Sequence, residues 1–254
     1  MLIVAGTIVY LSLPRTPQKP VPVFRPQALA KYPHDTTAFT QGLLIEGGKL
    51  YESTGHYGKS LVRRVDLKTG DTEQAHSLGK TFFGEGLAAL NGRLYQLTWK
   101  ERSAFVYDLQ SLTPLDTLPI PTQEGWGLTE DGEHLILSDG TDRLHFLDPQ
   151  SLEILREVEV RDGNRSVSKL NELEYINGLV YANVWQDSHI AIINPDDGTV
   201  VGWLNLAWLN VVHAPVDGAD VLNGIAYDPA SKRLYITGKL WPAIYAFALP
   251  DLEG

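Results

Sequence analysis

The chain has 254 residues, of which 43% are apolar and 20% are charged, a balance that is ordinary for a globular protein and argues against extensive disorder. Its formal net charge of −10 argues against a nucleic-acid partner, because phosphates require a basic surface, and suits a cationic ligand such as a protonated peptide N-terminus. Cysteine is absent, which excludes disulfides, thiolate nucleophiles and cysteine-based zinc sites.

The chain begins with a short apolar run, "MLIVAGTIVYLSLP". The run has the length of a signal-peptide core and is too short to span a bilayer comfortably. A proline-rich stretch follows and predicts an extended linker. We therefore interpret residues 1–20 as an export signal or membrane-anchor stub, with a wrongly assigned start codon as the alternative. Residues 21–254 form the folded domain, and the protein is expected to be periplasmic or secreted, with membrane contact only through its N-terminus.

From residue 41 onward one pattern recurs five times: a Gly-Leu-like start, a hairpin turn, a strand of the type L-Y-x-x-x-G and a further strand. The turns carry hairpin signals such as "NG", "DG" and "GG". The anchor residues of the copies lie 44, 41, 45 and 52 residues apart, at Leu43, Leu87, Leu128, Leu173 and Ile225. A period of about 40–45 residues with four short strands is typical of a propeller blade. The sequence therefore predicts an all-β, five-bladed β-propeller.

Two segments outside the pattern complete this architecture. The fifth copy ends near Pro250 after only three strands, and the stretch "VFRPQALAKYP" before the first copy is expected to supply the missing strand and close the ring. The longest gap, before the fifth copy, contains "GWLNLAWLNVVHA". Its apolar residues fall near helical spacing and predict a short helix in a blade connection.

The innermost strand of each blade lines the central channel, so the residue before each Gly-Leu start points towards one mouth of that channel. These channel-mouth positions hold Gln41, Glu85, Trp126, Asn171 with Glu172, and Asn223. Polar or aromatic groups stand where a packed core would place small apolar ones, so their convergence predicts a ligand site. For each residue taken singly, a hydrogen-bonded channel side chain is the alternative.

Further residues extend the same pattern. Trp99 and Trp185 each lie 14 residues after the channel-mouth residue of their own repeat, and Lys239 occupies the equivalent place in the fifth repeat. Together with Phe83 and Trp126 they predict an aromatic pocket with a few polar groups, the composition of a small-molecule or peptide-end site. The glycines on either side of the carboxylate in "FFGEGL" predict a close approach of backbone or substrate.

Other catalytic motifs are missing. Neither H-E-x-x-H nor G-x-S-x-G occurs, and the seven histidines are scattered singly, so no zinc hydrolase or serine hydrolase is indicated. A quinone- or metal-dependent propeller enzyme would need clustered ligands that the sequence lacks. We therefore expect no metal and no cofactor.

Eight segments resemble the glutamine cyclotransferase family, the plant- and bacterial-type glutaminyl-peptide cyclotransferases. They are "FTQGL", "FFGEGL", "YQLTWK", "EGWGLT", "LNELEYING", "NVWQD", "VLNGIAYDP" and "TGKLWP". The resemblance runs in order through about residues 30–250, and family members are five-bladed propellers, in agreement with the repeat count. It implies an enzyme that converts the N-terminal Gln of peptides or proteins to pyroglutamate with release of ammonia, and that needs no metal.

The resemblance also implies the site residues. Its catalytic group comprises Glu85, Lys239, Asn171 and Gln41, and its substrate-binding group comprises Phe39, Phe83, Trp99, Trp126 and Trp185. We hypothesise that Glu85 acts as general base and then general acid, with a pKa raised by desolvation. Gln41 and Asn171 would fix the γ-amide and stabilise the developing oxyanion. Lys239 would donate to the first peptide carbonyl of the substrate or to the oxyanion, and the sequence does not decide between these two acceptors.

A non-catalytic propeller that binds peptide N-termini or sugars at the same mouth is the alternative. An isolated carboxylate beside a Gln, an Asn and a Lys favours the enzyme, because a binding module has no need of that set. We expect a monomer.

Overall fold

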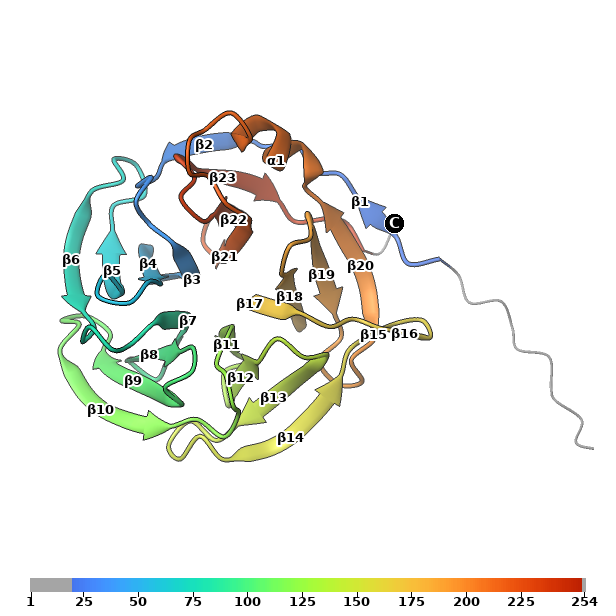
Figure 1. Cartoon of the computed structure of the whole chain (residues 1–254). Helices are drawn as coiled ribbons and strands as arrows, with labels where there is room; N and C mark the ends of the chain where they lie inside the picture. Colours follow the sequence, from blue (N-terminus) through green and yellow to red (C-terminus); the bar gives the residue numbers. More distant parts are fainter. Residues whose placement is uncertain (1–19, 253–254) are drawn as a thin grey trace, which may run out of the picture.

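Five β-sheets surround a central axis in the computed structural model, which describes residues 20–252 (Figure 1). This arrangement confirms the predicted five-bladed β-propeller. The proposed export signal falls outside the described residues except for Pro20. Within residues 20–252, no helix is long and apolar enough to cross a membrane.

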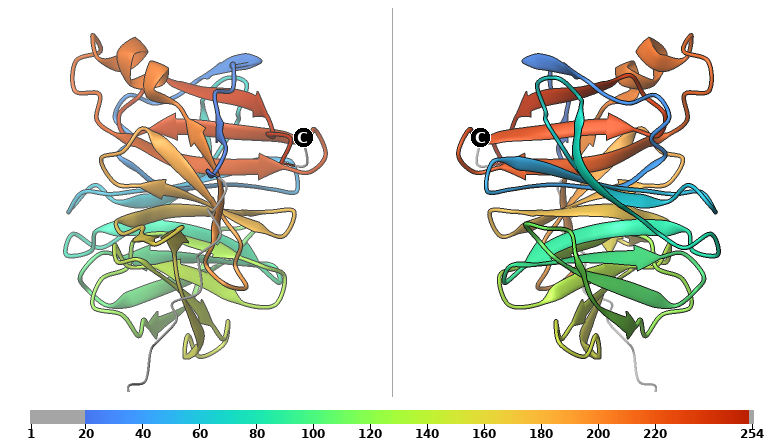
Figure 2. Two further views of the ribbon diagram at one scale, coloured as in Figure 1. Left: turned by 90° about the vertical axis from the view of Figure 1, so that its right-hand side faces the viewer. Right: turned by 90° about the vertical axis from the view of Figure 1, so that its left-hand side faces the viewer.

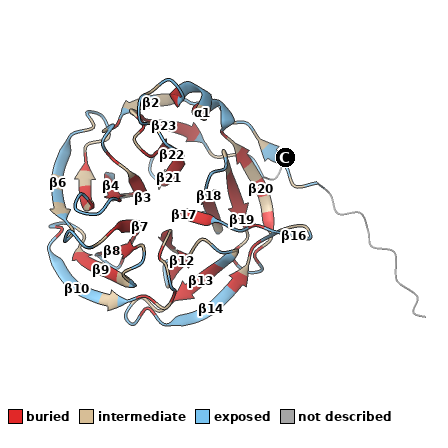
Figure 3. Cartoon of the chain, in the orientation of Figure 1, coloured by how far each residue is buried: buried red, intermediate tan, exposed pale blue. Residues whose placement is uncertain are grey.

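Each blade starts with its innermost strand and runs outwards in chain order. The first two blades comprise β3 (Thr40–Glu46), β4 (Lys49–Thr54), β5 (Leu61–Val65) and β6 (Thr72–Ser77), then β7 (Gly84–Leu90), β8 (Arg93–Thr98), β9 (Ser103–Asp108) and β10 (Pro114–Pro119). The third comprises β11 (Leu128–Glu130), β12 (Leu135–Ser138), β13 (Arg143–Leu147) and β14 (Ile154–Glu159). The inner strands are buried, and much of the outer strands β6, β10 and β14 faces solvent (Figure 3).

The last two blades each receive a strand from the N-terminal segment. The fourth comprises β17 (Leu170–Ile176), β18 (Leu179–Val184), β19 (His189–Ile193) and β20 (Val200–Asn205), with β1 (Val23–Phe24) added in parallel. The fifth comprises β21 (Leu222–Asp228), β22 (Arg233–Gly238) and β23 (Ala243–Ala248), with β2 (Ala30–Pro33) added antiparallel. The β2 pairing confirms the predicted closure of the ring. The β1 pairing was not predicted.

The connection between the last two blades contains the predicted short helix, α1 (Ala207–His213). The helix is shorter than the predicted segment, because residues 202–205 continue β20 instead. Seen edge-on, α1 projects from one face of the ring (Figure 2). A small hairpin, β15 (Arg161–Asp162) and β16 (Arg165–Ser166), precedes the fourth blade and was not predicted.

The glycine and the aliphatic anchor at the start of the repeat motif both serve the packing of the inner strands. The anchors are almost fully buried, Leu43 at 0% and Leu87 at 1% exposure, and each buried aliphatic side chain contributes about 1.5–3 kcal/mol. In four of the five copies a glycine precedes the anchor, and in the fourth copy Glu172 takes this place. At Gly42 and Gly86 the missing side chain allows two inner strands to approach each other. A Cβ on Gly42 would lie 2.6 Å from the backbone nitrogen of Leu87, and one on Gly86 would lie 2.5 Å from that of Leu128.

A buried network ties the closing strand to the first blade; we call it the clasp. His34, just after β2, contacts the Trp241 carbonyl at 2.7 Å through Nδ1 and Glu52 at 2.9 Å through Nε2. Arg63 donates to both Glu52, at 2.6 Å, and Asp35, at 2.8 Å. Burial alone would raise the pKa of Glu52, but His34 and Arg63 lower it to about 2. Burial opposes protonation of His34, but Glu52 outweighs it and raises the His34 pKa.

Candidate active site

A pocket of about 250 Å³ opens at the mouth of the channel on the α1 side of the ring. Its lining consists of Phe39, Gln41, Phe83, Glu85, Trp99, Trp126, Asn171, Trp185, Asp220 and Lys239. The structure therefore brings together all nine residues that the family resemblance implied for the site. The tenth, Asp220, was missed because it belongs to the connection after α1, which has no counterpart in the other repeats.

Irregular pairing at the start of the inner strands aims the polar side chains into this pocket. The register of β7 against β8 shifts between Gly84 and Leu87, and that of β17 against β18 shifts between Leu170 and Leu173. Such β-bulges re-aim side chains and are frequent beside active sites. Here the first bulge contains Glu85. Comparable shifts occur in β3 and β21.

Glu85 is the buried carboxylate of the pocket, with 4% exposure. Gln41 Nε2 donates a hydrogen bond to Glu85 Oε1 at 2.8 Å. Burial raises the pKa of Glu85 well above its ordinary value; Lys239 opposes this, whereas Glu124 and Glu101 add to it. A Cβ on the flanking Gly84 would lie 2.7 Å from the Thr54 carbonyl oxygen. The group that approaches this glycine closely is therefore the backbone of the neighbouring blade.

Lys239 is the buried cation of the pocket, with 4% exposure. Burial lowers its pKa, and Glu85 and Asp220 act in the opposite direction. Its Nζ lies 4.6 Å from the centroid of the Phe39 ring. Within residues 20–252, no carboxylate lies within 4.0 Å of Lys239 Nζ. The ammonium group is therefore not committed to a structural ion pair.

The two asparagines at channel-mouth positions have different surroundings. Asn171 lines the pocket, and its Oδ1 atom is buried without a hydrogen-bond partner in the described part of the chain. Asn223 lies behind the pocket, where Nδ2 donates to the Thr40 carbonyl at 2.9 Å and to Gln41 Oε1 at 3.3 Å. Asn223 thus fixes the amide of Gln41 so that its nitrogen faces Glu85. Asn171 is left free to bind a ligand.

Glu172, expected at the mouth with Asn171, does not line the pocket. Its carboxylate accepts hydrogen bonds from the backbone nitrogens of Leu43, at 3.1 Å, and Ile225, at 2.8 Å. It therefore ties the inner strands of three blades together. Glu172 and Asn223 are therefore hydrogen-bonded channel side chains, which was the alternative interpretation of each channel-mouth residue.

The aromatic residues form two groups in the wall. Phe39, Phe83 and Trp99 make a chain of ring contacts, with centroids 6.2 Å and 5.6 Å apart. Trp126 and Trp185 pack edge to face at 5.7 Å. Such contacts stabilise aromatic pairs beyond their simple burial. The wall is consequently a fixed apolar surface around the polar groups.

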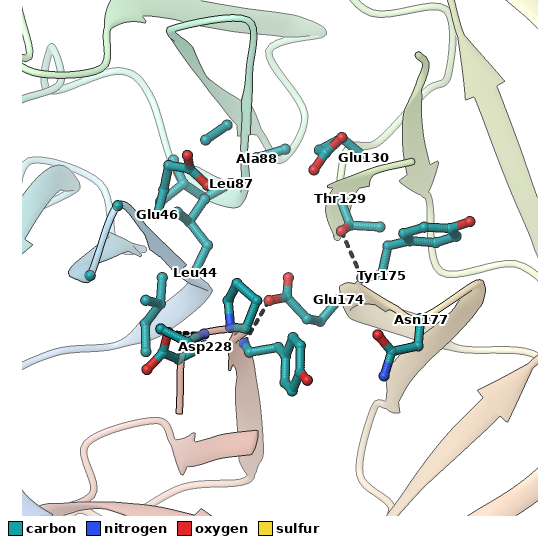
Figure 4. A pocket seen from close by; sticks show the side chains of 17 residues that line it. Leu44, Glu46, Leu87, Ala88, Thr129, Glu130, Glu174, Tyr175, Asn177 and Asp228 are labelled. Carbon is teal, nitrogen blue, oxygen red and sulfur yellow. Dashed lines mark hydrogen bonds between the residues drawn. The ribbon is translucent and has the colours of Figure 1, made fainter. Parts of the chain in front are cut away.

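A larger cavity, of about 460 Å³, lies at the opposite mouth (Figure 4). It includes Glu46 at the far end of β3, Glu130 and Glu174, and none of the described residues that line it is basic. Glu174 accepts the Tyr227 backbone hydrogen at 2.7 Å. Size favours this cavity, but chemistry favours the smaller pocket, where a carboxylate, a cation and an unpartnered amide meet aromatic walls. In residues 20–252, no group of three or more His, Cys, Asp or Glu is arranged to hold a metal.

Comparison with known proteins agrees with this arrangement. The sequence model of the family described as glutamine cyclotransferase matches residues 1–249. The chain belongs to the glutamine cyclotransferase family. It is 47% identical over 226 residues to a glutaminyl-peptide cyclotransferase of Arabidopsis thaliana, covering 88% of this chain and 71% of that protein. The predicted family is thereby confirmed.

A solved structure of a glutamine cyclotransferase relative supports the fold. The crystal structure of Myxococcus xanthus glutaminyl cyclase superposes with a TM-score of 0.85 at 37% identity. The match covers 92% of this chain and 100% of the Myxococcus chain. The five-bladed ring described above is therefore shared with a glutaminyl cyclase over almost its whole length.

Proposed function

We propose that this chain cyclises the N-terminal glutamine of peptides and proteins to pyroglutamate and releases ammonia. The observation that carries the proposal is the buried Glu85, hydrogen-bonded to Gln41 inside an aromatic pocket that also contains Lys239. The Arabidopsis relative, named as a glutaminyl-peptide cyclotransferase, supports the same activity. The substrate class follows: a peptide with a free N-terminal Gln.

The pocket contributes first by orientation. The nucleophile, the α-amine, and the electrophile, the γ-amide carbon, belong to the same residue and meet only when the side chain folds back. A fixed cavity of about 250 Å³ with aromatic walls favours that compact conformer over the extended ones. Holding reacting groups in register is among the largest sources of rate enhancement.

Glu85 moves the proton. As the α-nitrogen bonds to the γ-carbon, the Glu85 carboxylate removes a proton from that nitrogen. The same proton then passes to the amide nitrogen, the bond between this nitrogen and the γ-carbon breaks, and ammonia leaves while the ring carbonyl re-forms. One group serves as base and then acid, which is efficient when its pKa lies nearer to neutral pH. Burial raises the pKa of Glu85 and so shifts it in the direction that favours this double role.

The other polar groups stabilise the developing charges. Lys239 places a positive charge in the pocket, where it would stabilise the oxyanion that forms on the γ-carbonyl oxygen. Asn171 Oδ1, which has no hydrogen-bond partner among residues 20–252, would accept a hydrogen from the substrate's amine or amide nitrogen. We further propose that the reaction needs no metal, because Lys239 and Glu85 supply the charge and the proton transfer.

The test is ammonia release from a peptide that begins with Gln. The matched control is the same peptide with its α-amine acetylated, which has no nucleophile and should release nothing. Turnover of the free peptide at the spontaneous rate, by folded protein, would overturn the proposal and leave the non-catalytic binding alternative. Activity that persists in a strong chelator would support the metal-independent reaction, and its loss would contradict it.

Export and a monomeric state are separate proposals. They rest on the apolar start of the sequence and on the self-contained ring of residues 20–252. Fractionation of the producing cells and light scattering of the purified protein test them. Recovery of the protein in the cytoplasm would contradict export, and a stable dimer would contradict the monomeric state.

A further inference from the structure

Glu124 lies in the loop between β10 and β11, outside the pocket lining, yet it holds two pocket walls. Its Oε2 atom accepts the Nε1 hydrogen of Trp99 at 2.8 Å and that of Trp126 at 2.9 Å. The two indoles come from different blades, since Trp99 follows β8 and Trp126 precedes β11. One carboxylate oxygen therefore fixes the relative position of two rings that the fold supplies separately.

The backbone around Glu124 is itself anchored. The Gly125 nitrogen donates to the Trp99 carbonyl at 2.9 Å, and the Trp126 nitrogen donates to the Ser138 carbonyl at 2.9 Å. Thr122 Oγ1 donates to the Glu124 carbonyl at 2.9 Å. The carboxylate is thus presented from a fixed loop. A shift of its side chain would release the indoles without moving their strands.

The hydrogen bonds also limit what the indoles can do. An indole has one polar hydrogen and no other donor or acceptor. Because Trp99 and Trp126 both direct that hydrogen to Glu124, their contact with a ligand is confined to ring faces and edges. They are shape-defining walls, and the polar contacts to a ligand are left to the amides, the ammonium and the carboxylate of the pocket.

Glu124 also acts on Glu85 through its charge. The nearest ammonium group, Lys100 Nζ, is 3.8 Å from Oε1 and stands 3.8 Å from the centroid of the Trp99 ring. The charged groups that act on Glu85 are Lys239, which lowers its pKa, and Glu124 and Glu101, which raise it. Glu124 consequently affects the reacting centre in two ways. Its charge raises the pKa of Glu85, and its hydrogen bonds hold the two indoles of the pocket wall.

We propose that Glu124 is a positioning residue that locks the Trp99 and Trp126 indoles in the orientation needed to fold the substrate's glutamine side chain. The effect on catalysis rests on the proposed cyclase function, whereas the effect on the rings does not. Glu124→Ala removes the acceptor, and Glu124→Gln retains an amide oxygen that can accept both indole hydrogens. Glu133→Gln, on an exposed turn, is the matched control for loss of one negative charge.

Glu124→Ala should lower kcat/KM for a Gln-initiated peptide roughly tenfold to a hundredfold, the cost of a small misplacement in a site. Glu124→Gln should recover most of that loss, within about threefold of the parent protein, and Glu133→Gln should match the parent. The acid limb of the Glu124→Gln profile should move to lower pH, since a charge that raises the Glu85 pKa is gone. Full activity of Glu124→Ala, or equal damage in Glu124→Gln, would overturn the proposal.

A second measurement is independent of turnover. Acrylamide quenching of tryptophan fluorescence should increase in Glu124→Ala and stay at the parent level in Glu124→Gln. In a background carrying Trp99→Phe and Trp126→Phe, which lacks both indole hydrogens, Glu124→Ala should add no further change in quenching. Unchanged quenching in the single variant would overturn the ring-holding role. A parent protein that releases no ammonia would overturn the cyclase function alone.

Discussion

The two mouths of the channel both contain buried carboxylates, but they differ in what surrounds them. Burial raises the pKa of Glu85 at one mouth and of Glu174 at the other. Around Glu85 stand two side-chain amides, a lysine and five aromatic side chains. Glu174 meets a backbone hydrogen-bond donor and further carboxylates. A perturbed pKa alone therefore does not identify a catalytic group in this ring. The catalytic candidate is the carboxylate that shares its pocket with a lysine and with an amide whose oxygen lacks a partner among the described residues.

The largest effect is expected from Glu85→Gln. The amide cannot take or return a proton, so ammonia release should fall by about 10²–10⁴, the usual contribution of a positioned acid–base group. Circular dichroism and the melting temperature should show a folded protein, since the side chain keeps its size and can still bond Gln41. Substantial residual activity in this variant would remove Glu85 from the proton-transfer role and erase the distinction between the mouths.

Lys239→Met should have the next largest effect. Loss of the charge beside the developing oxyanion should lower kcat by about 10²–10³. Because Lys239 lowers the pKa of Glu85, its removal raises that pKa further, and the acid limb of kcat/KM should move to higher pH. Lys49→Met, at the exposed start of β4 with its surface ion pair to Glu73, is the control and should change neither. An unmoved acid limb would contradict the coupling between the two groups.

The clasp predicts a pH-dependent stability. His34→Gln should destabilise the ring by about 1–3 kcal/mol, because it leaves buried partners of His34 unpaired. The raised pKa of His34 makes its contribution complete below pH 6.5 and lost as pH rises through that raised value. Glu52, with a pKa of about 2, contributes above pH 4.5 and less as pH falls towards 2. The melting-temperature difference between parent and variant should peak from pH 4.5 to 6.5; a difference independent of pH would contradict this.

The smallest effect is expected from Glu174→Gln. Burial raises the pKa of this carboxyl well above its usual range, so a neutral amide resembles the protonated acid, and its oxygen can still accept the Tyr227 hydrogen. Activity should stay within about twofold and the free energy of unfolding within about 0.5–1 kcal/mol. A large loss of turnover would show that the opposite mouth takes part in the reaction.

The repeats account for how much the sequence predicted. Five copies of one motif indicated the ring, the missing strand and the channel-mouth positions. They could do so because each blade buries its own anchor residue, such as Leu43 or Leu87, in the same way. Some features outside the repeats were missed, although the closing strand β2 and the helix α1 were predicted. Asp220 sits in a unique connection, and β1 has only two residues, Val23 and Phe24, too few to carry a strand pattern.

Side-chain direction was the second limit. Asn171 and Glu172 were placed together at the mouth, yet only Asn171 reaches the pocket. The register shift between Leu170 and Leu173 decides which side chain faces which way, and neighbouring backbone fixes that bulge, so no sequence pattern records it. Glu124 shows the same limit, since it precedes Trp126 by two residues in a recognised motif and its role depends on two indoles meeting in space.

The closing strand has a consequence for how the protein is made. His34 and Trp241, which meet in the clasp, are 207 residues apart in the chain, so ring closure is a contact of very high sequence separation and is expected to form late in folding. The pocket takes Phe39 from one end of the chain and Lys239 from the other. During synthesis the nascent chain should therefore be inactive until its final blade has left the ribosome. Recovery of activity on refolding would then report ring closure itself, and a fragment lacking the last blade should be inert towards any substrate.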